Sequence, residues 1–216
     1  KRITAMPVGA WIPQIVPSAH SAGEAFVIVN NYRKDDWTPF LYHTTDFGKS
    51  WVNLLEGNKV WGYTLSVVQD PVTPDLLFVG TEFGLYFTLD KGHSWIKWGE
   101  TYPTVSTMDL KIHPREHDLI IGTFGRAAYI IDDIRPLRDM AMNSKDGKLS
   151  GLNLFEPPVA YLSARQQASG SRFAGYGIFA GENRRSGGSI TYYLESLKPD
   201  TVELDGVKEV KEAKSD

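Results

Sequence analysis

The sequence predicts an all-β fold made of repeated four-stranded sheets, and an internal repeat is the main observation behind that prediction. Residues Leu41–Trp51 return as Leu85–Trp95, with Leu, Tyr, Thr, Asp, Gly, Ser and Trp in the same order. Asp46 and Asp90 lie 44 residues apart, and the two copies align without a gap. A repeat of about 40–50 residues is the length of one four-stranded blade of a β-propeller.

The repeated stretch has the chemistry of a tight turn between two strands. Its Asp carboxylate can accept hydrogen bonds from backbone N–H groups a few residues further on. Its Gly can adopt the positive φ that such a turn needs, and its Trp can anchor the turn by burying the ring between sheets. We therefore assign the motif to structure rather than to catalysis. It comprises Thr44, Asp46, Gly48, Ser50 and Trp51, and then Thr88, Asp90, Gly92, Ser94 and Trp95.

Three blades follow one another, because strand-length apolar stretches recur in order. In the first blade we expect strands at 11–16, 25–29, 40–44 and 51–54, with a polar turn over 30–39. In the second we expect strands at 63–68, 76–81, 84–88 and 95–98. In the third we expect strands at 106–112, 119–123 and 128–132, since His113-Pro114 takes the place of Asp70-Pro71.

The third blade lacks a fourth strand of its own. Ile134-Arg135-Pro136 replaces the Asp turn, and proline cannot donate to a sheet ladder. Three blades do not close a propeller, which needs at least about four, and an open stack exposes apolar faces. We therefore expect about three blades at the end of a larger propeller, with the missing blades belonging to a longer chain. Assembly with further copies is the alternative, and a strand from the propeller's N-terminus could complete the last blade.

The character of the chain changes after the third blade. Residues 137–142 could form a short helix, and 154–161 looks extended because Pro157-Pro158 favours polyproline geometry. The glycine-rich stretch 170–189 reads as a loop. A strand is expected at 189–194, with a partner at 202–210. We divide the chain into C-terminal propeller blades (1–136), a connecting segment (137–188) and the start of a second, β-sandwich-like domain (189–216).

The repeated turn resembles the Asp box, Ser/Thr-x-Asp-x-Gly-x-Thr/Ser-Trp, of the bacterial neuraminidase repeat (BNR). Residues 70–85, 112–115, 122–126 and 131–138 resemble the last two blades of bacterial sortilin-like propellers, which are often labelled glycosyl hydrolases. Residues 154–158, 183 and 190–194 resemble the segment that leaves that propeller. The family has Asn-Pro-Pro-Tyr-Gly-Ala where this chain has Asn-Arg-Arg-Ser-Gly-Gly at 183–188. The resemblance implies an exported bacterial protein, placed in the periplasm, on the cell surface or in the medium.

Composition excludes several classes of function. The net charge of −3 gives no electrostatic basis for binding nucleic acid. No apolar run is long enough for a membrane span, so we expect no direct membrane insertion. There is no Cys, hence no disulfide and no thiolate nucleophile. The five histidines lack metal-ligand spacing. We expect neither a metal nor a cofactor.

Candidate ligand-binding residues lie in the turns at the blade ends opposite the Asp boxes, since propeller ligands gather at such loops. Carboxylates beside Trp suit sugar binding, and two carboxylates could hydrolyse a glycoside. The plainer interpretation is that Asp35 and Asp36 pair with Arg33 or cap a turn, and that Arg126 tethers a loop. The candidates are Arg33, Asp35, Asp36, Trp37, Trp61, Glu82 and Arg126.

Two functions from different classes remain open. The favoured one is an exported binding or scaffold module that docks a protein or peptide as part of a larger assembly. The alternative is a glycoside hydrolase of the Asp-box propeller kind, with carbohydrate as the ligand. The two differ in chemistry: hydrolysis needs two acids facing one another, roughly 5–10 Å apart.

Overall fold

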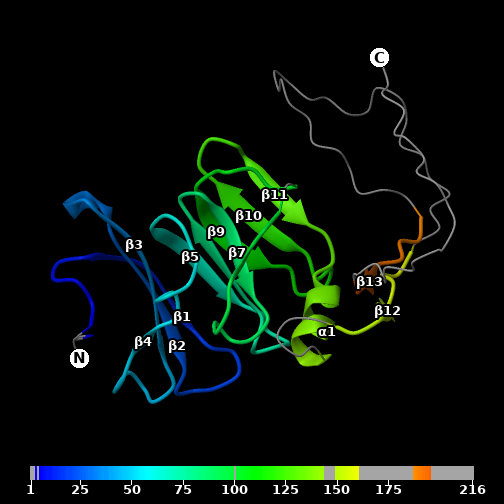
Figure 1. Ribbon diagram of the computed structural model, residues 1–216, viewed down its shortest axis with the longest axis horizontal. Coiled ribbons are helices and arrows are strands. Elements are labelled where there is room, and N and C mark those ends of the chain that lie inside the picture. The colour runs from blue at the N-terminus through cyan, green and yellow to red at the C-terminus, as the bar shows by residue number, and fades with distance from the viewer. Residues whose placement is uncertain (1–2, 4, 100, 144–148, 161–186, 196–216) are drawn as a thin grey trace, which may run out of the picture.

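Three antiparallel sheets follow one another along the chain in this computed structural model, which describes residues 3, 5–99, 101–143, 149–160 and 187–195 (Figure 1). The first sheet comprises β1 (Trp11–Pro17), β2 (Ala25–Asn31), β3 (Asp36–Thr44) and β4 (Val52–Asn53). The second comprises β5 (Thr64–Gln69), β6 (Leu77–Thr81), β7 (Gly84–Thr88) and β8 (Ile96–Lys97). The third comprises β9 (Thr107–Ile112), β10 (Leu119–Thr123) and β11 (Ala128–Ile131).

Each sheet is a meander in which every strand pairs with the next in sequence, which is the topology of a propeller blade. The predicted fold class, all-β with successive blades, is confirmed. The third sheet has three strands among the described residues, as the sequence predicted. The chain then enters α1 (Arg135–Asn143), a helix that starts two residues earlier than expected. Pro136 lies in its first turn, where a missing N–H costs nothing.

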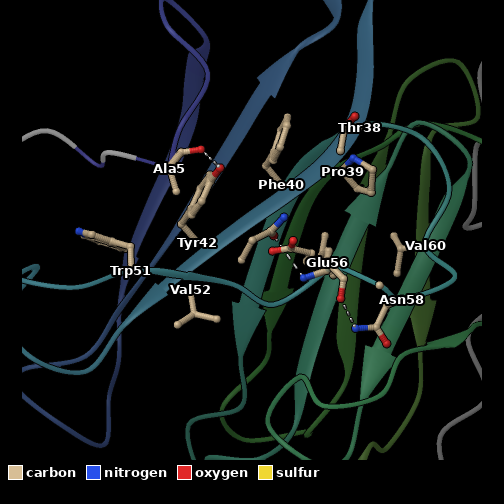
Figure 2. A pocket seen from close by; sticks show the side chains of 13 residues that line it. Ala5, Thr38, Pro39, Phe40, Tyr42, Trp51, Val52, Glu56, Asn58 and Val60 are labelled. Atoms are coloured by element: carbon tan, nitrogen blue, oxygen red, sulfur yellow. Dashed lines mark hydrogen bonds between the residues drawn. The ribbon is translucent and has the colours of Figure 1, made fainter.

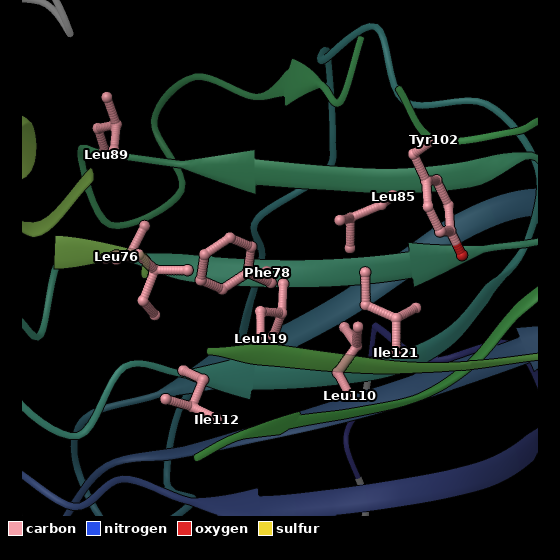
Figure 3. Close-up of a cluster of buried hydrophobic side chains, with 10 residues drawn as sticks. Leu76, Phe78, Leu85, Leu89, Tyr102, Leu110, Ile112, Leu119 and Ile121 are labelled. Atoms are coloured by element: carbon pink, nitrogen blue, oxygen red, sulfur yellow. The ribbon is translucent and has the colours of Figure 1, made fainter. Parts of the chain in front are cut away.

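Buried side chains from neighbouring sheets form the core. Figure 3 shows the cluster between the second and third sheets, where Phe78 and Leu85 meet Leu110, Leu119 and Ile121. Side chains of α1 pack against the same cluster. A second cluster joins the first two sheets, and a third lies under the N-terminal segment on the outer face of the first sheet. Alternate residues of β2 and β3 point to these two clusters, as the period of a strand requires.

Gly80 marks the closest approach between the second and third sheets. A Cβ at this position would lie 2.3 Å from Ser66 Oγ and 2.5 Å from the Thr107 carbonyl oxygen. Ser66 Oγ donates to that same carbonyl at 3.1 Å, so a polar contact joins β5 to β9 where the backbones meet. Glycine is required here for space rather than for its backbone freedom.

Two elements differ from the expectation. Residues 36–39 belong to β3 rather than to a turn, and a 3₁₀ helix, η1 (Tyr32–Lys34), makes the reversal before it. The strand β12 (Leu152–Leu154) pairs with β13 (Tyr192–Leu194), which links the predicted connecting segment to the predicted second domain. The expected partner strand at 202–210 lies outside the described residues. The divisions at 136 and 188 stay predictions.

Candidate functional site

The two repeated turns use their Asp side chains to hold the backbone. The Asp46 carboxylate accepts from Lys49 N at 2.8 Å, from Ser50 N at 2.9 Å and from Ser50 Oγ at 2.6 Å. These hydrogen bonds hold the pKa of Asp46 well below its usual value. Asp90 accepts from Ser94 and Thr88 in the same pattern. Both carboxylates are therefore engaged at the end of the sheets that carries the β3–β4 and β7–β8 turns.

A cavity of about 560 Å³ opens at the opposite end of the sheets, beside the β6–β7 turn. Its walls are mainly aromatic and apolar, and they come from three separate segments: the start of β3, the connection between β4 and β5, and the β6–β7 turn. One wall residue, Glu82, is acidic. The lining residues are Trp37, Pro39, Val60, Trp61, Gly62, Glu82 and Phe83. We name this the Glu82 cavity.

Two acidic side chains hold the start of β3 and the residue before it. Asp35 adopts a left-handed conformation (φ 61°) and its Oδ1 accepts from Trp37 Nε1 at 3.1 Å. Asp36 accepts from Asn31 Nδ2 at 3.1 Å and from the Thr38 amide at 3.2 Å. The hydrogen bond from Asn31 is the main reason why the pKa of Asp36 is lowered. These contacts orient Trp37, which lines the cavity.

Stacked rings support the Trp37 side of the cavity. Tyr32 and Tyr63 stack with centroids 4.5 Å apart, and the Trp37 ring lies 5.7 Å from that of Tyr63. The Arg33 guanidinium lies over the rings of Trp11 and Tyr32, 4.7 and 4.9 Å from their centroids. Cation–π contacts of this kind contribute about 0.5–1 kcal/mol at exposed sites. Arg33 therefore braces the aromatic cluster and does not line the cavity.

Glu82 stands in a two-residue turn that the main chain holds in place. Its N–H donates to the Tyr63 carbonyl at 3.1 Å, and its carbonyl accepts from Ser106 Oγ at 3.3 Å. Its side chain is different, because Oε2 is buried and has no hydrogen-bond partner among the described residues. Burial raises the pKa of the Glu82 carboxyl above its usual value. An under-solvated acid of this kind is a recognised mark of a functional site.

A second cavity, of about 660 Å³, adjoins the first and is drawn in Figure 2. The two share Pro39 and Val60 as a common wall. Tyr42 and Phe40 form one side, and the Tyr42 hydroxyl donates to the Ala5 carbonyl at 2.9 Å. Glu56 and Asn58 stand on the loop that follows β4 (Figure 2). The two cavities therefore lie next to one another, with Pro39 and Val60 lining both.

The structure brings three of the seven predicted residues together at one site: Trp37, Trp61 and Glu82. Asp35 and Asp36 do not line the cavity but accept hydrogen bonds that shape the start of β3. Arg33 packs over the rings of Trp11 and Tyr32. Arg126 is exposed in the β10–β11 turn and does not line either cavity. Sequence reasoning missed Tyr32 and Trp11, whose aromatic character was the available signal.

Comparison with solved structures finds only distant similarity. A GH74 enzyme of Niastella koreensis matches 56% of this chain and 21% of its own length, at 17% identity and a TM-score of 0.46. YCF48 bound to D1 peptide matches 61% of this chain and 40% of its own, at 16% identity and a TM-score of 0.45. An ancestral GH74 enzyme matches 55% of this chain and 14% of its own, at 20% identity and a TM-score of 0.46.

The chain spans well under two thirds of each of these proteins, and the fold assignment rests on sheet order rather than on them. No protein-family model matches the chain, and no curated protein matches its sequence. Among the described residues, no helix is long and apolar enough to cross a membrane. Within the same residues, no group of three or more His, Asp or Glu side chains is placed to hold a metal ion.

Proposed function

We propose that this chain is a peptide- or protein-binding module built on Asp-box blades of the bacterial sortilin-like kind, exported and part of a larger assembly. The supporting observation is that two cavities adjoin, with Pro39 and Val60 lining both. Two adjoining cavities suit successive side chains of an extended peptide, and exposed aromatic rings provide contact area at low entropic cost. Trp61 is 71% exposed and Trp37 is 49% exposed, so both are available to a ligand.

Selection from a library of random heptapeptides displayed on phage, with the full 216-residue chain as bait, tests this proposal. We expect enriched peptides whose affinity falls at least about tenfold in Trp61→Ala, since a central aromatic contact contributes on the order of 2 kcal/mol. Phe124→Ala is the matched control, because Phe124 is 74% exposed in the β10–β11 turn and lines neither cavity. Failure to enrich any peptide, or equal losses in both variants, would contradict the proposal.

A glycoside hydrolase is the second candidate, and one observation favours it. The raised pKa of Glu82 suits a general acid, which must carry a proton near the working pH. The mechanism also needs a second carboxylate, whereas Asp35 and Asp36 are engaged within their own loop. Release of reducing ends from a panel of β-glucans would support hydrolysis, provided that Glu82→Gln abolishes it.

A further inference from the structure

The Glu82 cavity combines aromatic walls with a single, partly buried acid. Trp37, Trp61 and Phe83 supply three rings, and each is partly exposed, from 42% to 71%. Pro39, Val60 and Gly62 complete the walls without adding a side-chain hydrogen-bond donor. Indole and phenyl faces carry a negative quadrupole and attract a cation placed over them. The cavity therefore presents negative potential from its rings and from its acid alike.

Among the described residues, Glu82 Oε2 is buried without a hydrogen-bond partner. Burial is the cause of the raised pKa of this carboxyl. Arg33, one of the predicted candidates, lies over the rings of Trp11 and Tyr32 instead. Burial and the Glu82 charge raise the pKa of Tyr63, whereas the Arg33 charge lowers it. Within the described part of the chain, Oε2 therefore has no partner although an arginine belongs to the same aromatic cluster.

Glu82 is only partly buried, but a buried carboxylate oxygen without a hydrogen-bond partner is unfavourable for a folded protein. The local structure does not depend on it, because the turn is held through the main chain of Glu82 and through Thr81 Oγ1, which accepts from the Phe83 amide at 3.2 Å. A group that weakens the fold and holds nothing in place is typical of a binding site. A positively charged group from outside the described residues would relieve this cost.

We infer that the Glu82 cavity binds the side-chain cation of a peptide, the ammonium group of Lys or the guanidinium group of Arg. The inference deepens the proposed peptide-binding function, and it names the residue that would fill the first cavity. The alkyl stem of the bound side chain would lie along the apolar walls, and its charged end would meet Glu82 between the rings. The peptide backbone would continue over Pro39 and Val60 toward the second cavity.

Two small probes that differ only in the charge test the inference without any library. N-acetyl-lysine N-methylamide and N-acetyl-norleucine N-methylamide share the same stem, and only the first carries an ammonium group. Binding to the full chain is followed by the ¹H–¹⁵N signals of the tryptophan indoles, with the Trp61 signal assigned by Trp61→Phe. We expect the lysine compound to bind about tenfold more tightly than the norleucine compound, the range of a partly desolvated cation–π contact.

Two matched variants locate the effect. Glu82→Gln keeps the shape of the side chain and its main-chain hydrogen bonds, and we expect it to reduce lysine affinity to that of norleucine. Glu156→Gln removes an exposed acid that lines neither cavity, so we expect no change. Thermal unfolding of each variant establishes that it is folded.

Each result leads to a different conclusion. Equal binding of both probes, binding of neither up to millimolar concentration, or an unchanged lysine preference in Glu82→Gln would overturn the inference. If library peptides still bind in such a case, the peptide-binding function survives without cation selectivity. If the lysine probe binds as expected and the library yields nothing, the cation selectivity of the cavity stands, and the proposed peptide-binding function fails.

Discussion

Replacing Arg138 by Met tests how α1 is fixed to the second sheet. Arg138 is 5% exposed, and its Nε and Nη2 donate to Asp70 Oδ2 at 2.9 and 2.8 Å. Its Nη1 donates to His117 Nδ1 at 3.0 Å, since a guanidinium can only donate. Asp70 is fully buried, and its Oδ1 accepts from two backbone amides. Met fills much of the space of Arg but leaves the Asp70 charge without its partner.

The expected loss follows from the burial of the pair. Removing one partner of a buried ion pair costs about 3–5 kcal/mol, because the remaining charge is stranded in a poorly solvated place. For a domain of this size each kcal/mol lowers Tm by about 2–4 °C, so the loss corresponds to about 6–20 °C. Urea unfolding followed by tryptophan fluorescence measures the change in free energy of unfolding directly.

A control on the same helix and a double-mutant cycle separate the effect of this ion pair from other effects of the substitution. Arg135→Met removes the ion pair between Arg135 and Asp133, and the Arg135 side chain is 27% exposed. We expect this variant to lose about 1 kcal/mol or less in free energy of unfolding. Asp70→Asn combined with Arg138→Met should cost less than the sum of the two single losses. A loss below about 1 kcal/mol for Arg138→Met, or strict additivity in the cycle, would refute the view that this pair anchors α1.

Three further predictions concern the sheets and the cavity. Gly80→Ala should destabilise the protein by about 1–3 kcal/mol in urea unfolding through its clash with the Thr107 carbonyl, whereas Gly122→Ala, whose nearest neighbour lies at 3.6 Å, should be near neutral. For Asp90, burial alone would raise the pKa, but hydrogen bonds to Ser94 and Thr88 outweigh it and lower the pKa. The stability that Asp90 contributes is therefore lost as pH falls below about 4 and through its folded pKa. Asp90→Asn should cost about 1–3 kcal/mol in free energy of unfolding at pH 7, and its Tm should fall less than that of the unchanged protein when the pH is lowered below about 4. The Glu82 pKa is raised instead, so the free energy of unfolding falls as pH rises above about 4.5 and through the folded pKa. Glu82→Gln should therefore have a higher Tm than the unchanged protein at pH 7 and the same Tm at pH 4.

The repeat made the sheets predictable, because the strand and turn signals are local in sequence. The Asp46 and Asp90 turns follow from residues within four positions of the carboxylate. The Asp70–Arg138 pair joins residues 68 positions apart, and no spacing rule connects them. Pro136 was interpreted only as a reason why the third blade lacks a fourth strand, although the first turn of a helix accepts proline well.

The cavity could be predicted only in part, because its walls come from segments that are distant in sequence. Trp37, Trp61 and Glu82 were each recognisable as polar or aromatic residues in turns, but no periodic pattern places the β4–β5 connection beside the β6–β7 turn. Residues 36–39 read as a polar loop because Asp36 and Pro39 are turn formers. Pairing of Asp36 with Asn31 across the sheet overrides that local preference and extends β3. Packing between sheets decided the first point, and pairing of β2 with β3 decided the second.

The two ends of the sheets use acidic residues in opposite ways, and that contrast favours a binding role at the Glu82 end. At the end that carries the Asp46 and Asp90 turns, both carboxylates accept hydrogen bonds from their own turns, which lowers their pKa values and stabilises the fold. At the other end, the turn is held by backbone and hydroxyl groups, and Glu82 Oε2 has no hydrogen-bond partner among the described residues. Because the turn does not need the Glu82 side chain, another residue at this position would leave the turn intact and change which ligand is bound. The same blade can therefore keep its fold through one turn while the opposite turn determines which charge is bound.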